Sequence, residues 1–263
     1  MKQVEEIKFR CSSLGYILTE PRSKAEKDAG GLSETAKGHC VDVYASWMYD
    51  RREEVYSKYL EKGNSVEEDA ITLLSLHAKN LYFKNEDRLE NEFIAGTPDL
   101  FIKDGDVISV VEDIKSSWDI FTFLRSKHKE LNKNYYWQLM GYMWLTGADK
   151  SNLRYCLVNS TDSLIDDEKR KLAYAMKVFD NDTDPKYVEQ CKQIERNMIY
   201  DLKLFLTHYP HYPLANDVNE WKWDVPREKR IHTIEIVRDD IAIERIKEKV
   251  TACREYIKYN LMV

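Results

Sequence analysis

Apolar positions in the first 80 residues recur at helical spacing. This pattern predicts one helix over Ser33–Leu60 and a second that begins at Ser65. Ser65 is followed three residues later by Glu68, which is the spacing of a capping box. The residues that then share one face of the second helix are Val66, Ala70, Leu73, Leu74 and His77. The first third of the chain is therefore predicted to be mainly helical.

The periodicity changes at Asn91 from that of helices to that of strands. Phe93–Ile94 leads to two further short apolar runs, Leu100–Ile102 and Val107–Lys115, which a turn containing Gly105 joins into a hairpin. A long amphipathic helix over about 130–146 and a strand over about 153–158 follow. Helix, strand, strand, helix and strand in this order predict an α/β fold, with helices covering a mixed sheet.

The last hundred residues are predicted to be mostly helical. The pattern gives helices at 166–178 and 185–206, a Pro- and Trp-rich loop at 208–226, a strand near 232–237 and a final helix from Asp239. The final helix carries a core-facing stripe of Ile243, Ile246, Val250, Cys253 and Ile257. Since no linker or repeat divides the chain, we predict a single domain over residues 1–263, with a core at about 33–160 and a helical C-terminal extension at about 161–263.

Composition excludes several classes of protein. The chain has 263 residues, is 43% apolar and 33% charged, and carries a net charge of −6, which argues against global disorder. No run of apolar residues is long enough to cross a bilayer, and the amino-terminal segment is too polar for a signal peptide. We therefore expect a cytoplasmic protein without a membrane partner. Its cysteines form no CxxC pair, which argues against disulfides and zinc ribbons and predicts buried thiols.

The residues with the clearest chemistry lie in the predicted hairpin. Gly96-Thr97-Pro98-Asp99 precedes one strand, and Asp113-Ile114-Lys115 lies near the end of the next. Alternate residues of a strand share a face, so Asp113 and Lys115 point the same way. If the hairpin pairs in this way, Asp99 approaches Asp113, and the two carboxylates can bind a hard divalent cation between them.

Two glutamates at the start of the second helix compete to supply a third carboxylate. Glu68 is engaged if the capping box forms, whereas Glu67 shares the apolar side with Ala70 and Leu74. We therefore favour Glu67.

A later helix supplies two further polar groups. Gln138 and Tyr142 are one helical turn apart, and they could bind a phosphate or order a water molecule, or simply lie at a helix–sheet boundary.

In order and spacing, these residues resemble the PD-(D/E)XK nuclease superfamily, in particular lambda-exonuclease or YqaJ-type viral recombinases and RecB-like nucleases. The resemblance covers about residues 63–147. Gly63, Glu67 and Ala70 match the opening helix of the family, Pro98-Asp99 and Asp113-Ile114-Lys115 match its name, and Gln138 with Tyr142 matches its later helix.

The resemblance implies a restriction-endonuclease-like core and a metal-dependent nuclease. Mg²⁺, with Mn²⁺ as a substitute, would be held by Asp99, Asp113, the carbonyl of Ile114 and Glu67, and Lys115 would assist hydrolysis. It further implies 5′-to-3′ exonuclease activity on linear double-stranded DNA ends, in phage-type recombination or repair. A single-strand annealing protein as partner, a trimeric homo-oligomer and, for a phage-encoded chain, the host cytoplasm are also implied.

A basic run beside the predicted site is a candidate for DNA contact. It contains Arg125, Lys127, Lys129 and Lys133. Ser116 and Ser117 could contact phosphate, and Trp118 could stack on a base or pack in the core. A second run, Arg227, Lys229 and Arg230, has the composition of a solvated face.

Two other classes of function remain open at this stage. One is a site-specific or structure-specific endonuclease. The other is a catalytically silent DNA-binding or assembly module on the same fold, although clustered acids beside a polyanion argue against it.

Overall fold

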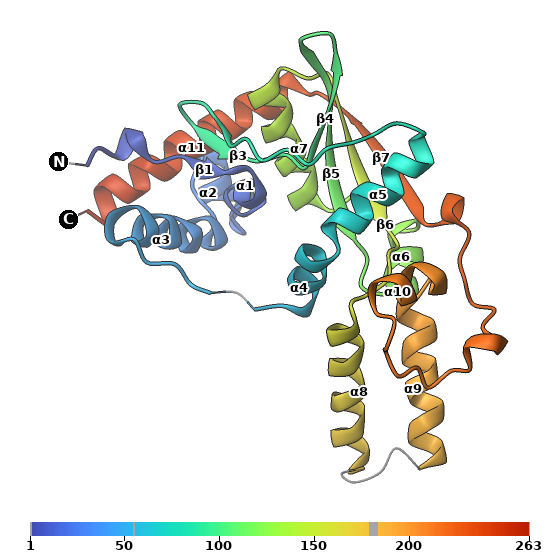
Figure 1. The fold of residues 1–263 in the computed structure, drawn as a ribbon. Coiled ribbons are helices and arrows are strands. Elements are labelled where there is room, and N and C mark those ends of the chain that lie inside the picture. The colour runs from blue at the N-terminus through green and yellow to red at the C-terminus, as the bar shows by residue number, and fades with distance from the viewer. Residues whose placement is uncertain (1, 55, 179–183, 263) are drawn as a thin grey trace.

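The structure is a computed structural model that describes residues 2–54, 56–178 and 184–262. A mixed sheet forms its centre (Figure 1). β4 (Leu100–Asp104) and β5 (Val107–Ser116) form an antiparallel hairpin, β6 (Lys150–Cys156) is parallel to β5, and β7 (Ile231–Val237) is antiparallel to β6. The predicted hairpin and the predicted mixed sheet of an α/β fold are therefore confirmed.

Helices cover both faces of this sheet. α7 (Lys133–Thr146) packs on the face that carries Val111 of β5 and Leu153 of β6. α5 (Glu67–Ala78) packs on the opposite face, where Ile114 belongs to the same buried cluster as the apolar side of this helix. Successive residues of β5 thus enter two different cores, as the alternation along a strand requires.

A second, smaller sheet ties the N-terminal residues to the main core. β1 (Phe9–Arg10) pairs in parallel with β3 (Ile94–Gly96), and β2 (Leu89–Glu90) pairs antiparallel with β3. This sheet approaches α7 closely at Gly96, where an added Cβ atom would lie 2.7 Å from Cε1 of Tyr142. Any side chain at position 96 would therefore push Tyr142 away from its place.

The remaining helices lie around these two sheets. In Figure 1, α8 (Asp162–Met176) and α9 (Pro185–Met198) lie side by side and extend away from the central sheet. The other α-helices of the described residues are α1 (Leu14–Ile17), α2 (Lys24–Asp28), α3 (Glu34–Tyr49), α4 (Lys58–Ser65), α6 (Ile120–Ser126), α10 (Leu202–His208) and α11 (Asp240–Asn260). None of the helices in the described segments is long and apolar enough to cross a membrane.

The predicted helix Ser33–Leu60 is wrong in its extent. Helix α3 begins after Ser33, whose hydroxyl accepts a hydrogen bond from the Ala36 amide, and it ends at Tyr49. It ends there because Asp50 adopts a left-handed conformation with a φ angle of 52°. A separate helix, α4, follows, and residue 55 of the predicted helix lies outside the described residues.

The predicted capping box at Ser65 is also wrong. Ser65 is the last residue of α4, and its hydroxyl donates to the Lys62 carbonyl at 3.1 Å, so it does not cap the next helix. α5 begins two residues later without a side-chain cap. The predicted face of this helix is buried from Val66 to Leu74, but His77 is exposed.

The C-terminal half departs from its prediction at two points. The helix predicted over 185–206 stops at Met198, and Asp201 starts α10 by accepting a hydrogen bond from the Leu204 amide at 3.0 Å. The division at about residue 160 does not follow the packing, because β7 pairs with β6 and α11 belongs to the main core. The predicted stripe of α11 is buried, and so are all five cysteine side chains.

Candidate active site

Asp99 and Asp113 lie next to each other where the β4–β5 hairpin begins and ends. Leu100 pairs with Glu112 in the ladder, so Asp99, one residue earlier, lies beside Asp113. Oδ2 of Asp99 accepts a hydrogen bond from the Ile114 amide at 2.6 Å, and Asp113 is only 1% exposed. The structure thus brings together the two carboxylates that the strand pattern predicted to meet.

Lys115 lies on the same face of β5 as Asp113. Its Nζ atom is 2.6 Å from Oδ2 of Asp113 and 5.0 Å from the ring centroid of Tyr135. Burial by itself lowers the pKa of Lys115, but the charges of Asp113 and Asp99 raise it, and the net shift is upward. The ammonium group is therefore charged at neutral pH and faces the carboxylate pair.

Gln138 and Tyr142 hold the Asp113 carboxylate from the helix above it. Gln138 Nε2 donates to Asp113 Oδ1 at 2.9 Å and to the Tyr142 hydroxyl oxygen at 3.0 Å, and that hydroxyl donates to the Thr97 carbonyl at 3.2 Å. Burial, followed by the charge of Asp113, raises the pKa of Tyr142, so the phenol keeps its proton. A role for this pair in binding phosphate or ordering water stays a prediction.

Glu67, at the start of α5, is the glutamate whose charge acts on Asp99. Its side chain is 26% exposed and lies 2.7 Å from Lys84 Nζ, and its charge is one of those that raise the pKa of Asp99. Glu68 is exposed to solvent. The structure therefore places Glu67, rather than Glu68, near Asp99.

The electrostatics of the pair favour a bound cation. Burial, and then the charge of Asp113, raises the pKa of Asp99 to about 7, although Lys115 and the Ile114 amide act in the opposite direction. Two carboxylates about 4 Å apart repel by about 4 kcal/mol at an effective dielectric constant near 20. Asp99 therefore takes up a proton near neutral pH unless another cation offsets its charge.

The donor set fits Mg²⁺. Within the described residues, no group of three or more His, Cys, Asp or Glu side chains is arranged to hold a metal ion. Mg²⁺ is usually held by one or two carboxylates together with water and substrate phosphate, so the Asp99–Asp113 pair meets its needs. Oδ2 of Asp113 is also buried, and it lies 2.6 Å from Lys115 Nζ.

Sequence reasoning missed the residues that hold Pro98-Asp99 in place. The backbone amide of Asn85 donates to the Asp99 carbonyl at 2.8 Å, and its side-chain amide donates to the Pro98 carbonyl at 3.0 Å. Lys84, the partner of Glu67, is the preceding residue. Both lie in an irregular polar stretch between α5 and β2, where no periodic signal indicates a role.

The residues predicted to contact DNA fall into two groups. Ser117 and Trp118 are buried at 7% and 8% exposure, and Trp118 packs in an apolar cluster with α8 and α10, which is the core-packing alternative. Ser116 is half-buried. The basic side chains, in contrast, are all exposed: Arg125, Lys127, Lys129 and Lys133.

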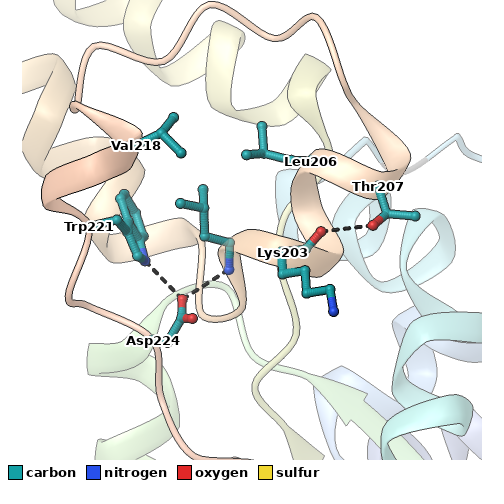
Figure 2. A pocket seen from close by; sticks show the side chains of 7 residues that line it. Lys203, Leu206, Thr207, Val218, Trp221 and Asp224 are labelled. Atoms are coloured by element: carbon teal, nitrogen blue, oxygen red, sulfur yellow. Dashed lines mark hydrogen bonds between the residues drawn. The ribbon is translucent and has the colours of Figure 1, made fainter.

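A pocket of about 480 Å³ lies away from these residues, between α10 and the 208–226 loop (Figure 2). Its lining includes Leu206, Val218 and Trp221, together with Asp224, which accepts hydrogen bonds from Trp221 Nε1 at 2.8 Å and from the Leu202 amide at 2.9 Å. No residue predicted for the site lines this pocket. The carboxylate pair, rather than this pocket, is therefore the candidate active site.

Among the solved structures with a similar fold are two proteins described as exonucleases. One is described as a phage-related exonuclease from Haemophilus somnus 129PT, with a TM-score of 0.67 and 28% identity over 98% of this chain and 96% of that one. The alkaline exonuclease LHK-Exo from Laribacter hongkongensis has a TM-score of 0.57 and 12% identity over 98% and 95%. Its complex with dAMP gives a TM-score of 0.56 at the same identity and coverage. No family model and no curated protein matches the sequence.

These likenesses confirm the resemblance to nucleases of the lambda-exonuclease type that the residue pattern predicted. They also confirm the α/β nuclease fold, since they extend over nearly the whole chain. Taken with the buried carboxylate pair, they support a nuclease function.

Proposed function

We propose that the protein is a metal-dependent deoxyribonuclease that hydrolyses phosphodiester bonds, and that it acts as a 5′-to-3′ exonuclease on linear double-stranded DNA. The observation that carries this proposal is the buried Asp99–Asp113 pair, with Lys115 Nζ 2.6 Å from Asp113. Its support from other proteins is the fold shared with exonucleases, one of which is solved with dAMP, a DNA nucleotide.

The residues of the site would have different roles in hydrolysis. Asp99, Asp113, the carbonyl of Ile114 and, directly or through water, Glu67 would hold Mg²⁺, for which Mn²⁺ could substitute. When bound, the cation would stabilise negative charge on the phosphate. The Lys115 ammonium positions the attacking water and offsets the charge that develops on the phosphate.

Comparing linear and covalently closed circular duplexes with Mg²⁺ tests this function directly. We expect degradation of the linear DNA alone, because an exonuclease needs an end. Cleavage of the circle would instead indicate an endonuclease. Intact DNA of both forms would indicate a silent binding module. The order in which nucleotides leave a duplex labelled at either end decides the polarity.

The biological setting is proposed from the resemblance. The activity would serve phage-type recombination or repair together with a single-strand annealing protein, and the chain would assemble as a homotrimer. Sedimentation analysis of the purified protein tests the trimer.

Glu67→Ala is expected to reduce turnover by about 10- to 100-fold, the usual cost of losing a group that supports a metal ligand. Its stability should change by less than about 1 kcal/mol, because its pair with Lys84 is partly exposed. Glu68→Ala is the matched control and should leave both quantities unchanged, since this side chain is exposed. Single-turnover cleavage and urea unfolding measure the two effects. A slower Glu68→Ala variant would show that the wrong glutamate was chosen.

A further inference from the structure

Two basic segments lie about a hundred residues apart in the sequence. Residues 125–133 contain four Lys and Arg with one Glu, and residues 227–230 contain three Lys and Arg with one Glu. Together they carry a formal charge of +5 in a chain whose net charge is −6. Their exposed basic side chains include Arg125, Lys127, Lys129, Arg227 and Lys229.

The fold brings these segments to the same edge of the sheet. Phe123 of α6 belongs to a buried cluster with Leu157 and Tyr200, and Val225 packs against this cluster. The Leu157 amide donates to the Arg230 carbonyl at 2.9 Å. α6 and the segment that begins at residue 225 therefore pack against the same buried cluster.

The side chain of His232 lies between the second segment and the candidate active site. Burial lowers its pKa, and so do the nearby charges of Lys127 and His128, which places the first segment close to β7. The His232 ring stacks on Tyr155, with centroids 6.0 Å apart, and Tyr155 pairs with Lys115 in the β5–β6 ladder. The two basic segments therefore lie at the same end of the sheet as the strand that carries Lys115.

A cavity of about 300 Å³ lies at the second basic segment and is lined by both Arg227 and Arg230. Arg230 is 6% exposed, yet its Nε atom has no hydrogen-bond partner, and its ion pair with Asp201 is a single contact at 3.3 Å. In contrast, Arg154 makes a two-point contact with Glu112, at 3.2 Å and 2.7 Å. Arg230 is thus a buried guanidinium group with unused capacity to bind an anion.

The two acids that line the same cavity also accept hydrogen bonds from helix α10. Asp201 accepts from the Leu204 amide at 3.0 Å, and Asp224 accepts from the Leu202 amide at 2.9 Å, so both satisfy amides of the first turn of α10. Arg227 has no acidic partner among the described residues, and its side chain is exposed. The two carboxylates balance the two guanidinium groups in formal charge, so the capacity of this cavity to bind an anion comes from the unpartnered Nε of Arg230 and the exposed side chain of Arg227.

We propose that the two basic segments form a track for a nucleic-acid backbone, and that the cavity between Arg227 and Arg230 takes one phosphodiester group. This phosphate site is distinct from the carboxylate pair. None of the residues that line the cavity belongs to the candidate active site. The Leu157 amide, which donates to the Arg230 carbonyl, lies one residue beyond Cys156 at the end of β6. The choice of nucleic acid rests on the proposed function.

The salt dependence of DNA binding tests the track. Affinity for a labelled linear duplex is measured in EDTA, where cleavage cannot occur, over a range of NaCl concentrations. Arg227→Gln and Arg230→Gln should each make the negative slope of log K against log salt shallower by about 0.9, the value for one lost phosphate contact. Lys103→Gln removes one exposed charge from the far end of the hairpin, and its slope should equal that of the wild type.

Arg227→Gln is decisive should Arg230→Gln fail to fold, because the Arg227 side chain is exposed. An unchanged slope for Arg227→Gln, an equal loss for Lys103→Gln or a wild type that does not bind DNA would each overturn the proposal. Failure of the proposed function is a separate result. If the wild-type protein cleaves no DNA with Mg²⁺ but Arg227→Gln still reduces the salt dependence of binding, the track is supported and the nuclease function is not. If the wild-type protein cleaves DNA but both arginine variants show the wild-type salt dependence of binding, the nuclease function is supported and the track is excluded.

Discussion

Asp113→Asn is expected to abolish DNA cleavage, with a loss of at least about 10³-fold in single-turnover rate. Asparagine can still accept the hydrogen bond from Gln138, so the fold around α7 is kept. Its amide NH₂, however, replaces the oxygen that lies 2.6 Å from Lys115 Nζ, and the charge that would bind a cation is lost. Cleavage of an end-labelled linear duplex with Mg²⁺ measures the loss.

Asp106→Asn makes the same chemical change in the exposed turn of the same hairpin and should cleave at the wild-type rate. Urea unfolding and DNA binding in EDTA show whether each variant is folded. A folded Asp113→Asn variant with wild-type cleavage would remove Asp113 from the mechanism.

Lys115→Met should also be inactive, because it removes the ammonium group and leaves the buried Asp113 charge unpaired.

The sequence predicted the part of the site that depends on local geometry. Strand alternation fixes the relative directions of Asp113 and Lys115. The hairpin register, which shifts by one residue at an irregularity between Ile102 and Lys103, brings Asp99 beside them. The long apolar periodicity of the last helix also identified its buried stripe correctly. These features need only residues that are neighbours along one element or across one hairpin.

Contacts between distant elements could not be predicted in this way. Lys62 is fully buried and donates to the Trp118 carbonyl at 2.8 Å, which joins the helix before Glu67 to the segment after β5. Helix ends were missed where a single residue decides them. Asp50 ends α3 through its left-handed backbone conformation, and the side chain of Asp201 caps the start of α10. Single polar residues at such ends leave the apolar periodicity unchanged, so the pattern continues across the break.

The surface formed by the second basic segment could not be predicted from the sequence either. By composition, residues 227–230 are a solvated run, and nothing in the sequence relates them to residues 125–133. Pairing of β7 with β6 carries them to the edge of the sheet where α6 begins. The surface therefore results from sheet topology, which a single sequence specifies only through contacts between distant residues.

Without a divalent cation, the protein is expected to lose stability as the pH rises from about 4 to about 7. Burial, and then Asp113, raises the pKa of Asp99 from 3.8 to about 7. Over this range the folded protein therefore holds a proton that the unfolded chain has released, and stability falls with pH. Each pKa unit corresponds to about 1.4 kcal/mol, so the contribution of Asp99 approaches about 4 kcal/mol above pH 7.

Urea unfolding in EDTA across this pH range, for the wild type and Asp99→Asn, measures the effect. The variant should lack this part of the pH dependence because its amide does not titrate, whereas Asp106→Asn should behave as the wild type. Mg²⁺ should stabilise the wild type more at about pH 8 than at about pH 5.5, since it competes with the proton on Asp99, and should stabilise Asp99→Asn less. Parallel pH curves for wild type and Asp99→Asn would show that Asp99 is not a perturbed acid, and equal Mg²⁺ shifts would show that it does not bind the ion.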